Sequence, residues 1–136
     1  MKINRNEFLK ALDSTTPGLS NRELLEQSDK YVFQNGKIIT FNDYIYCEAP
    51  VNLPGITAAV AAKSLVNQLR KWEEEEIDVI CKESELIITG ENGQKSGFRI
   101  EKEINLAVDG VPKPEKWEKL PEGFIDAVDA VCSCVG

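Results

Sequence analysis

The hydrophobic positions near the N-terminus recur with the period of an α-helix. Between Glu7 and Ser14, apolar residues stand at helical spacing, and Asn6 before them is a residue type that caps helices well. Pro17 and Gly18 follow, and a helix rarely continues through such a pair. The pattern therefore predicts a short amphipathic helix over residues 7–14.

Downstream of this helix the pattern becomes that of β-strands. Two runs rich in β-branched and aromatic residues, 31–33 and 37–41, flank Asn35-Gly36, a pair typical of a two-residue hairpin turn. A third such run follows at 44–47 after another turn. We therefore expect a three-stranded meander between residues 30 and 48.

The following stretch has the same order of elements. A short strand over 56–60 leads into helical spacing over 61–72, and strand-like runs follow at 77–82, 85–89 and 96–100. Each half of the chain is thus predicted as a strand, a helix and three strands, which is the pattern of an internal repeat. Two unrelated α+β halves are the alternative interpretation.

The composition suits one ordinary soluble domain. The chain has 136 residues, of which 42% are hydrophobic, and its formal net charge is -7. That charge argues against holding nucleic acid through bulk charge, although a local basic face is compatible with it. The sequence contains no histidine, which excludes Ser/His/Asp and Cys/His catalysis and every metal motif that needs imidazole.

Neither the cysteines nor the clustered acids form a recognisable metal site. The four cysteines, at 47, 81, 132 and 134, include no C-x-x-C pair, so we expect structural or incidental thiols. Cys47 and Cys81 lie in apolar runs and are expected to be buried, and a redox role for Cys132 and Cys134 is the alternative. The glutamates at 73–76 are expected to form a solvated acidic turn. No metal or cofactor is predicted.

No targeting segment is recognisable in the sequence. Residues 1–6 are polar and lack the apolar core of a signal peptide. No apolar run approaches the roughly 20 residues that a membrane-spanning helix needs. We therefore expect an intracellular, cytoplasmic protein.

A longer repeat relates the two ends of the chain. The run Phe-Ile-Asp-Ala-Val-Asp at 124–129 echoes Phe-Leu-Lys-Ala-Leu-Asp at 8–13, a separation of 116 residues that is about one domain. A proline-rich, charged segment precedes the second copy. We expect one complete unit over 1–110, an interdomain strap over 111–121, and the opening helix of a second, truncated unit over 122–136.

Two strand-helix-meander halves followed by the start of another unit resemble the bacterial DNA polymerase III β subunit, the sliding clamp, and specifically its first domain. The matching stretches are 3–12, 35–43, 60–70 and 86–100, and the segment around Trp117 resembles the crossing into the clamp's second domain. Their order and spacing carry the resemblance. It implies an α+β DNA-clamp fold in which two helices pack on antiparallel sheets.

The sequence also departs from the clamp pattern. Residues 23–27 stand in a slightly shorter segment where clamps usually carry a Leu-Pro-Ile-Leu-like run, and Ala61 stands where the family commonly has proline. These differences indicate a divergent member, such as one from a phage or mobile element. They leave the loop around Arg22 less well matched than the rest of the fold.

The resemblance implies partners as well as a fold. Sliding clamps are homo-oligomeric processivity factors of DNA replication, in which clamp domains form a head-to-tail ring around duplex DNA and contact its backbone. They also bind a DNA polymerase and a clamp loader. The family's pocket for those two partners lies in later domains, so the contacts fall on regions largely absent from this chain.

The helix predicted over 61–72 separates its apolar and cationic residues. At about 100° per residue, its apolar stripe consists of Ala62, Leu65, Leu69 and Trp72. The opposite face carries Lys63, Asn67, Arg70 and Lys71. A helix face that carries cations and no acids is suited to contact the phosphate backbone of DNA without reading its bases. The alternative is an ordinary cationic face that is exposed to solvent.

The resemblance extends this set of candidate DNA-binding residues. Lys63 and Arg70 fall on positions that are basic in the family, and Arg22 matches a clamp arginine that touches DNA. Lys10 shares the polar side of the first helix with Glu7, and we include it in the set. The candidate DNA-binding residues are Arg22, Lys63, Arg70, Lys71 and Lys10.

Two functions follow from these observations. The leading hypothesis is a sliding-clamp subunit, or a fragment of one, that encircles duplex DNA without sequence specificity as part of a ring and has no catalytic activity. The alternative is a clamp-like module that binds a protein of a replication complex and does not bind DNA. An enzyme is disfavoured, because no acid/base pair, nucleophile or metal cluster stands out.

Overall fold

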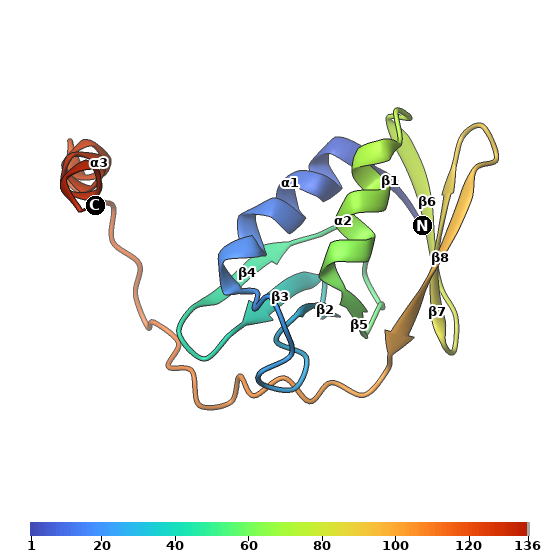
Figure 1. The fold of residues 1–136 in the computed structure, drawn as a ribbon, viewed down its shortest axis with the longest axis horizontal. Helices are drawn as coiled ribbons and strands as arrows, with labels where there is room; N and C mark the ends of the chain where they lie inside the picture. The colour runs from blue at the N-terminus through green and yellow to red at the C-terminus, as the bar shows by residue number, and fades with distance from the viewer. Residues whose placement is uncertain (136) are drawn as a thin grey trace.

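The computed structural model describes residues 1–135 and follows the repeat expected from the sequence (Figure 1). The elements of the first half are β1 (Lys2–Asn4), α1 (Arg5–Thr15), a 3-10 turn (Thr16–Gly18), β2 (Lys30–Gln34), β3 (Lys37–Phe41) and β4 (Tyr46–Pro50). Those of the second half are β5 (Ala58–Ala61), α2 (Ala62–Lys71), β6 (Glu76–Cys81), β7 (Glu85–Gly90) and β8 (Lys95–Glu101). A last helix, α3 (Phe124–Cys134), follows a long linker.

The strands form one eight-stranded antiparallel sheet in the order β1-β6-β7-β8-β5-β2-β3-β4. Each half lends its first strand to the other half, because β1 pairs with β6 and β5 pairs with β2. The two four-stranded parts join where β5 meets β8, through the pairs Ala59–Glu101 and Val60–Ile100. The expected α+β fold with two repeated halves is therefore confirmed.

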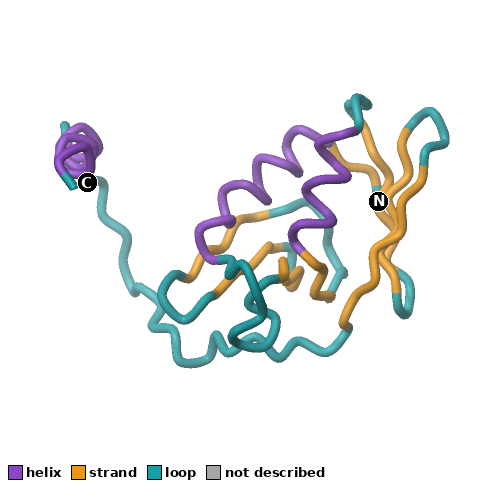
Figure 2. The backbone as a smooth tube through the Cα atoms, in the orientation of Figure 1, coloured by secondary structure: helices purple, strands orange, loops and turns teal. Residues whose placement is uncertain are grey.

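Both helices of the repeat lie side by side on one face of the sheet (Figure 2). Helix α1 buries Phe8 and Leu12 completely, and α2 buries the apolar stripe predicted from the sequence, including Leu65 and Leu69. The ring of Phe8 packs against Phe33 of β2 with centroids 6.0 Å apart. This burial of apolar side chains between helices and sheet holds the two halves together.

The first helix begins earlier than its sequence pattern predicts. Asn4 is the N-cap, since its side-chain oxygen accepts a hydrogen bond from the Glu7 amide at 3.0 Å, so the prediction of Asn6 as the cap is wrong. A tertiary contact sets this boundary. The Arg5 amide donates to the Glu75 carbonyl oxygen at 2.7 Å, directly after β1 has paired with β6.

The expected strands are present, with shifted ends. The Asn35-Gly36 turn is confirmed, and both residues have the positive φ angles, 53° and 71°, that such a hairpin turn requires. β4 starts at Tyr46 rather than at residue 44. The side-chain oxygen of Asn42 accepts hydrogen bonds from the backbone amides of Tyr44 and Ile45, and this holds the two residues in a turn. β5 covers 58–61 rather than 56–60.

The cysteines and glutamates differ in part from expectation. Cys47 and Cys81 are half-buried rather than buried, and Cys132 and Cys134 are exposed on α3. Three of the glutamates at 73–76 face solvent as predicted, but Glu74 is half-buried, and neither of its carboxylate oxygens has solvent or a hydrogen-bond partner. Within residues 1–135, no group of three or more His, Cys, Asp or Glu residues could hold a metal ion.

The linker after β8 covers the face of the sheet opposite the helices. Leu106 is buried there against Val32 and Ala59. Gln27, fully buried, holds the backbone beside it: its amide nitrogen donates to the Glu103 carbonyl oxygen at 2.8 Å, and its amide oxygen accepts from the amides of Asn105 and Leu106. The linker is thus anchored as far as Leu106.

Helix α3 stands apart from the sheet at the end of the strap, residues 111–121 (Figure 1). It has no buried residue, and its apolar side chains Phe124, Ile125, Val128 and Val131 are exposed. α3 therefore contributes nothing to the core formed by the two halves.

None of the helices within residues 1–135 is long and apolar enough to cross a membrane.

Candidate nucleic-acid interface

Helix α2 presents three cations on the side facing away from the sheet. Lys63, Arg70 and Lys71 are all exposed, whereas Leu65 and Leu69 between them are buried. The sequence of α2 contains no acidic residue. The segregation predicted from the sequence is therefore present in the structure, and it places the three positive charges on the solvent side of α2.

Helix α1 beside it has mixed charge. Lys10, a candidate from the sequence, is exposed, but Glu7 and Asp13 are exposed on the same helix. Arg5 is half-buried and serves the fold, since its guanidinium donates to the carbonyl oxygens of Glu74 at 2.7 Å and Leu69 at 3.1 Å. The contact with Leu69 satisfies a carbonyl near the end of α2. α1 thus adds little net charge to the face.

The two helices are joined by an ion pair that the sequence pattern did not reveal. A guanidinium nitrogen of Arg70 donates to Asp13 Oδ1 at 2.9 Å. Both side chains remain largely in solvent, with 60% of Arg70 and 49% of Asp13 exposed. α2 by itself carries no acid, so only the packing of α1 against α2 brings a negative charge to Arg70. The position of Asp13 on the polar side of α1 was the only available signal.

A shallow depression of about 210 Å³ lies between the two helices, beside this ion pair. Its polar lining consists of Asp13 on α1, Thr16 directly after α1, Tyr31 on β2, and Lys63, Asn67 and Arg70 on α2. The Tyr31 hydroxyl lies 3.4 Å from Thr16 Oγ1, and burial raises the pKa of Tyr31 against the opposing effect of that hydrogen bond. The hydroxyl is therefore protonated at neutral pH.

Arg22 lies in the loop between the 3-10 turn and β2, and its side chain is exposed. Its neighbours Ser20 and Asn21 line a second depression together with Lys63, at the start of α2. The loop thus borders the cationic side of α2. No hydrogen bond or ion pair within residues 1–135 fixes the Arg22 side chain.

The end of this loop is held by a charged cluster around Lys30. Its ammonium group lies near the carboxylates of Glu23, Asp29 and Glu101. Partial burial opposes the charge on Lys30, but the hydrogen bonds and attraction of these three acids outweigh burial and raise the pKa of Lys30. Lys30 is consequently occupied by intramolecular contacts and is not a candidate for binding DNA.

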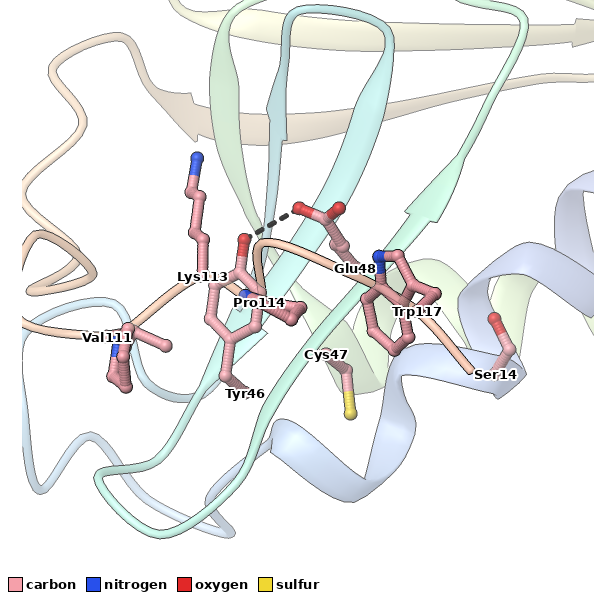
Figure 3. Close-up of a pocket in the computed structure, with 9 residues that line it drawn as sticks. Ser14, Tyr46, Cys47, Glu48, Val111, Lys113, Pro114 and Trp117 are labelled. Carbon is pink, nitrogen blue, oxygen red and sulfur yellow. Dashed lines mark hydrogen bonds between the residues drawn. The ribbon is translucent and has the colours of Figure 1, made fainter. Parts of the chain in front are cut away.

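A separate groove of about 430 Å³ lies between β4 and the strap (Figure 3). β4 contributes Tyr46, Cys47 and Glu48, and the strap contributes Pro114 and Trp117, among others. The Tyr46 hydroxyl donates to Glu48 Oε2 at 2.8 Å, and Lys37 donates to the other oxygen of the same carboxylate at 3.1 Å. These contacts lower the pKa of Glu48, with the Tyr46 hydrogen bond as the largest cause.

Comparison with known proteins gives matches among solved structures alone. No protein-family model matches the chain, and no curated protein matches it. The chain is similar to the DNA polymerase III β chain of Streptococcus pneumoniae, with 16% identity, a TM-score of 0.63, and coverage of 88% of this chain and 34% of that chain. The β subunit of Streptococcus pyogenes DNA polymerase gives 18% identity, a TM-score of 0.62, and coverage of 88% and 33%.

A third structure, a putative DNA polymerase III β subunit from Eubacterium rectale, gives 12% identity, a TM-score of 0.66, and coverage of 88% and 33%. The chain therefore spans about a third of the length of the clamp chains that it matches. At these low identities the likeness concerns the fold. It confirms the resemblance stated from the sequence: the chain has the fold of a divergent sliding-clamp domain.

Proposed function

We propose that this chain is a subunit, or a fragment of a subunit, of a DNA sliding clamp. It encircles duplex DNA as part of a ring of clamp domains and has no catalytic activity of its own. In this proposal the helices α1 and α2 face the DNA, and the residues that contact its backbone are Lys63, Arg70, Lys71, Lys10 and Arg22. A polymerase and a clamp loader bind the ring through other domains.

One observation carries the proposal beyond the fold. In a chain of net charge -7, the charged residues of α2 are all cations, and all three are exposed on the side away from the core. Phosphate contacts position a protein on DNA without reading its bases. A helix face with cations and no acids can contact a duplex of any sequence. A sliding clamp needs this property, because it moves over many sequences.

The negative net charge suits retention by topology. An isolated domain with three or four phosphate contacts would bind DNA with a dissociation constant of about 10⁻⁴ M or weaker at physiological salt. Ring closure then holds the protein on DNA, and the contacts within the ring are weak enough to move. Overall negative charge reduces adhesion to DNA outside the ring.

The proposal includes a domain arrangement. Residues 1–110 are the clamp-like domain, 111–121 the interdomain strap, and 122–136 the opening helix of a second domain. The exposed apolar side of α3 supports this, because Phe124 and Val128 stand in the repeat where α1 has Phe8 and Leu12, which are buried. α3 would pack against the sheet of its own domain in the same way.

The test is charge neutralisation on α2. The triple variant Lys63→Gln, Arg70→Gln, Lys71→Gln removes the three cations without placing a new acid beside Asp13. Binding of a labelled duplex at low salt should be lost, and melting should change little, because all three side chains are exposed. The expected salt dependence of the wild-type chain is a slope of log affinity against log salt of about -3.

The strap supplies a matched control. Lys113→Gln, Lys116→Gln, Lys119→Gln makes the same change in net charge at three exposed positions away from α2. This variant should retain most of the low-salt binding. Equal losses in both triple variants would mean that net charge, and not the α2 face, governs binding, and would contradict the proposal.

The alternative, a clamp-like module that binds a replication protein and no DNA, is favoured by the groove beside the strap. Trp117 is 84% exposed at this groove, and aromatic residues in such positions are frequent in protein interfaces. If the wild-type chain shows no binding to duplex at low salt, while Trp117→Ala abolishes binding to a replication partner, this second function is the correct one.

A further inference from the structure

The ion pair between α1 and α2 points to a role for Asp13 in controlling the cationic face. We propose that Asp13 competes with a DNA backbone phosphate for the guanidinium of Arg70, so that Arg70 is available to DNA only after it exchanges one anionic partner for another. The ligand of this site is one phosphate of a duplex backbone. This inference rests on the proposed function and assigns a regulatory residue to its face.

The arrangement of α2 defines where the phosphate would lie. Lys63, Asn67 and Arg70 stand at successive turns of the helix, and all three line the shallow depression between α1 and α2. Thr16 and Tyr31 line the same depression. These groups are hydrogen-bond donors or cations, and Asp13 is the one acid that lines the depression with them. Leu19, Ala62 and Val66 complete the lining as apolar residues. An anion in this place would gain from the polar and cationic neighbours and would be opposed only by Asp13.

The Asp13 contact is weak enough to exchange. Exposed ion pairs contribute little, because solvent screens them and because both side chains lose freedom in forming them. The distance of 2.9 Å joins a single oxygen of Asp13 to a single nitrogen of Arg70, and both side chains remain largely in solvent. A phosphate presents more charge and more acceptor oxygens, and arginine recognises it in a bidentate manner.

The consequence is a clamp face whose affinity is held down. While Asp13 occupies Arg70, the depression keeps one negative charge, and a duplex is held by the other cations of the face. Removal of the carboxylate should release Arg70 and add one phosphate contact to those of Lys63 and Lys71. The proposal therefore predicts a gain of binding from a loss of charge at one specific residue.

The test is Asp13→Asn in the full 136-residue chain, measured by fluorescence anisotropy with a labelled duplex. One added phosphate contact should make the slope of log affinity against log salt steeper by about 0.9. Between about 50 and 200 mM salt, the variant should therefore lose about threefold more affinity than the wild type does. The asparagine keeps the size of the side chain, and thermal melting verifies that the fold is intact.

Two controls separate a specific exchange from a general change in charge. Glu7→Gln removes the same charge from an exposed position on the same helix, and within residues 1–135 Glu7 has no ion pair. It should leave the slope unchanged. In the second control, Asp13→Asn is added to Arg70→Gln, where it should have no effect on the slope because the guanidinium is absent.

The outcomes distinguish this inference from the proposed function. An equal effect of Asp13→Asn and Glu7→Gln, or no effect of Asp13→Asn in a wild-type chain that binds DNA, overturns the competition and leaves the clamp function standing. Binding by Asp13→Asn alone, with none by the wild type, supports a strong form of the competition. No binding by either protein at low salt overturns both the inference and the proposed function.

Discussion

Helices α1 and α3 have related sequences and opposite environments. Each has 11 residues, and the Phe-x-x-Ala pattern of α1 recurs in α3. In α1, Phe8 and Leu12 are fully buried, whereas Phe124 and Val128 in α3 remain exposed. A helical period therefore specifies which side of a helix is suited to burial, and burial itself depends on a partner surface elsewhere in the chain.

The difference arises from what precedes each helix. β1 directly precedes α1 and pairs with β6, which positions the helix over the sheet. Before α3 comes the strap, where no strand is formed between residues 111 and 121.

We refer to residues 1–110 as the body and to 111–135 as the tail. The body holds its own core, and the predictions below test how sharply the two regions differ.

The largest expected effect is truncation of the buried position in α1. Leu12→Ala should lower the free energy of unfolding by about 3 kcal/mol, because it removes a fully buried side chain and leaves a cavity. Val128→Ala, at the matching position of α3, should change it by less than about 0.5 kcal/mol. Urea denaturation of both variants measures the contrast, and similar losses would show that α3 belongs to the core of the body.

The second prediction concerns Gln27, which holds the end of the body, the linker after β8, against the sheet. Gln27→Ala should cost about 2 kcal/mol, since the amides of Asn105 and Leu106 lose their acceptor while they stay in a partly buried place. Hydrogen exchange at these two amides should accelerate in the variant. Gln94→Ala, in an exposed turn, is the control and should have no measurable effect. Unchanged exchange at residue 105 would contradict the anchoring.

The third prediction concerns Tyr46, at the border where β4 meets the strap. Burial, followed by the nearby Glu48 carboxylate, raises the pKa of Tyr46 to about 12. The neutral phenol is thus favoured by the fold, so its contribution to stability is present below the unfolded pKa of about 10 and is lost as pH rises from about 10 to 12.

Absorbance titration of tyrosinate, with Tyr46→Phe as the reference, measures this pKa. Glu48→Gln should move it back toward the ordinary value, because the hydrogen-bonding carboxylate and its charge are removed together. A pKa that is the same in the wild type and in Glu48→Gln would show that burial alone accounts for the shift.

The smallest expected effect is that of removing the last segment. A chain that ends at residue 121 should melt within about 2 °C of the 136-residue chain, because α3 has no buried residue and contributes nothing to the core. The shortened chain should also be more soluble, because five large exposed apolar side chains are removed with the segment. A loss of several degrees would contradict the division into body and tail.

Much of the fold could be predicted because local chemistry and the tertiary structure agree. The hairpin at Asn35-Gly36 forms because both residues tolerate the left-handed backbone that the turn demands. The apolar residues Ala62, Leu65 and Leu69 of α2, and Trp72 directly after it, lie buried as their spacing predicts. In these places each residue satisfies its local preference and its packing at once.

The remaining features depend on contacts between segments far apart in the chain. The start of α1 is set by the Arg5 amide and the Glu75 carbonyl oxygen, which a local capping pattern cannot show. The ion pair of Asp13 with Arg70 joins residues 57 positions apart, and Gln27 binds the linker 78 positions away. The period of a helix identifies its polar side without revealing which charge from another helix will lie beside it.

The central claim, that DNA lies on the helices of the body, is tested most directly by mapping where a duplex binds. An amide NMR titration of the isotope-labelled chain with a short duplex at low salt should shift the amides of α2, from Ala62 to Lys71, and those on the adjoining side of α1. The same shifts should appear with duplexes of unrelated sequence and should disappear as salt is raised. Shifts confined to the tail, or no shift at millimolar duplex, would contradict the claim.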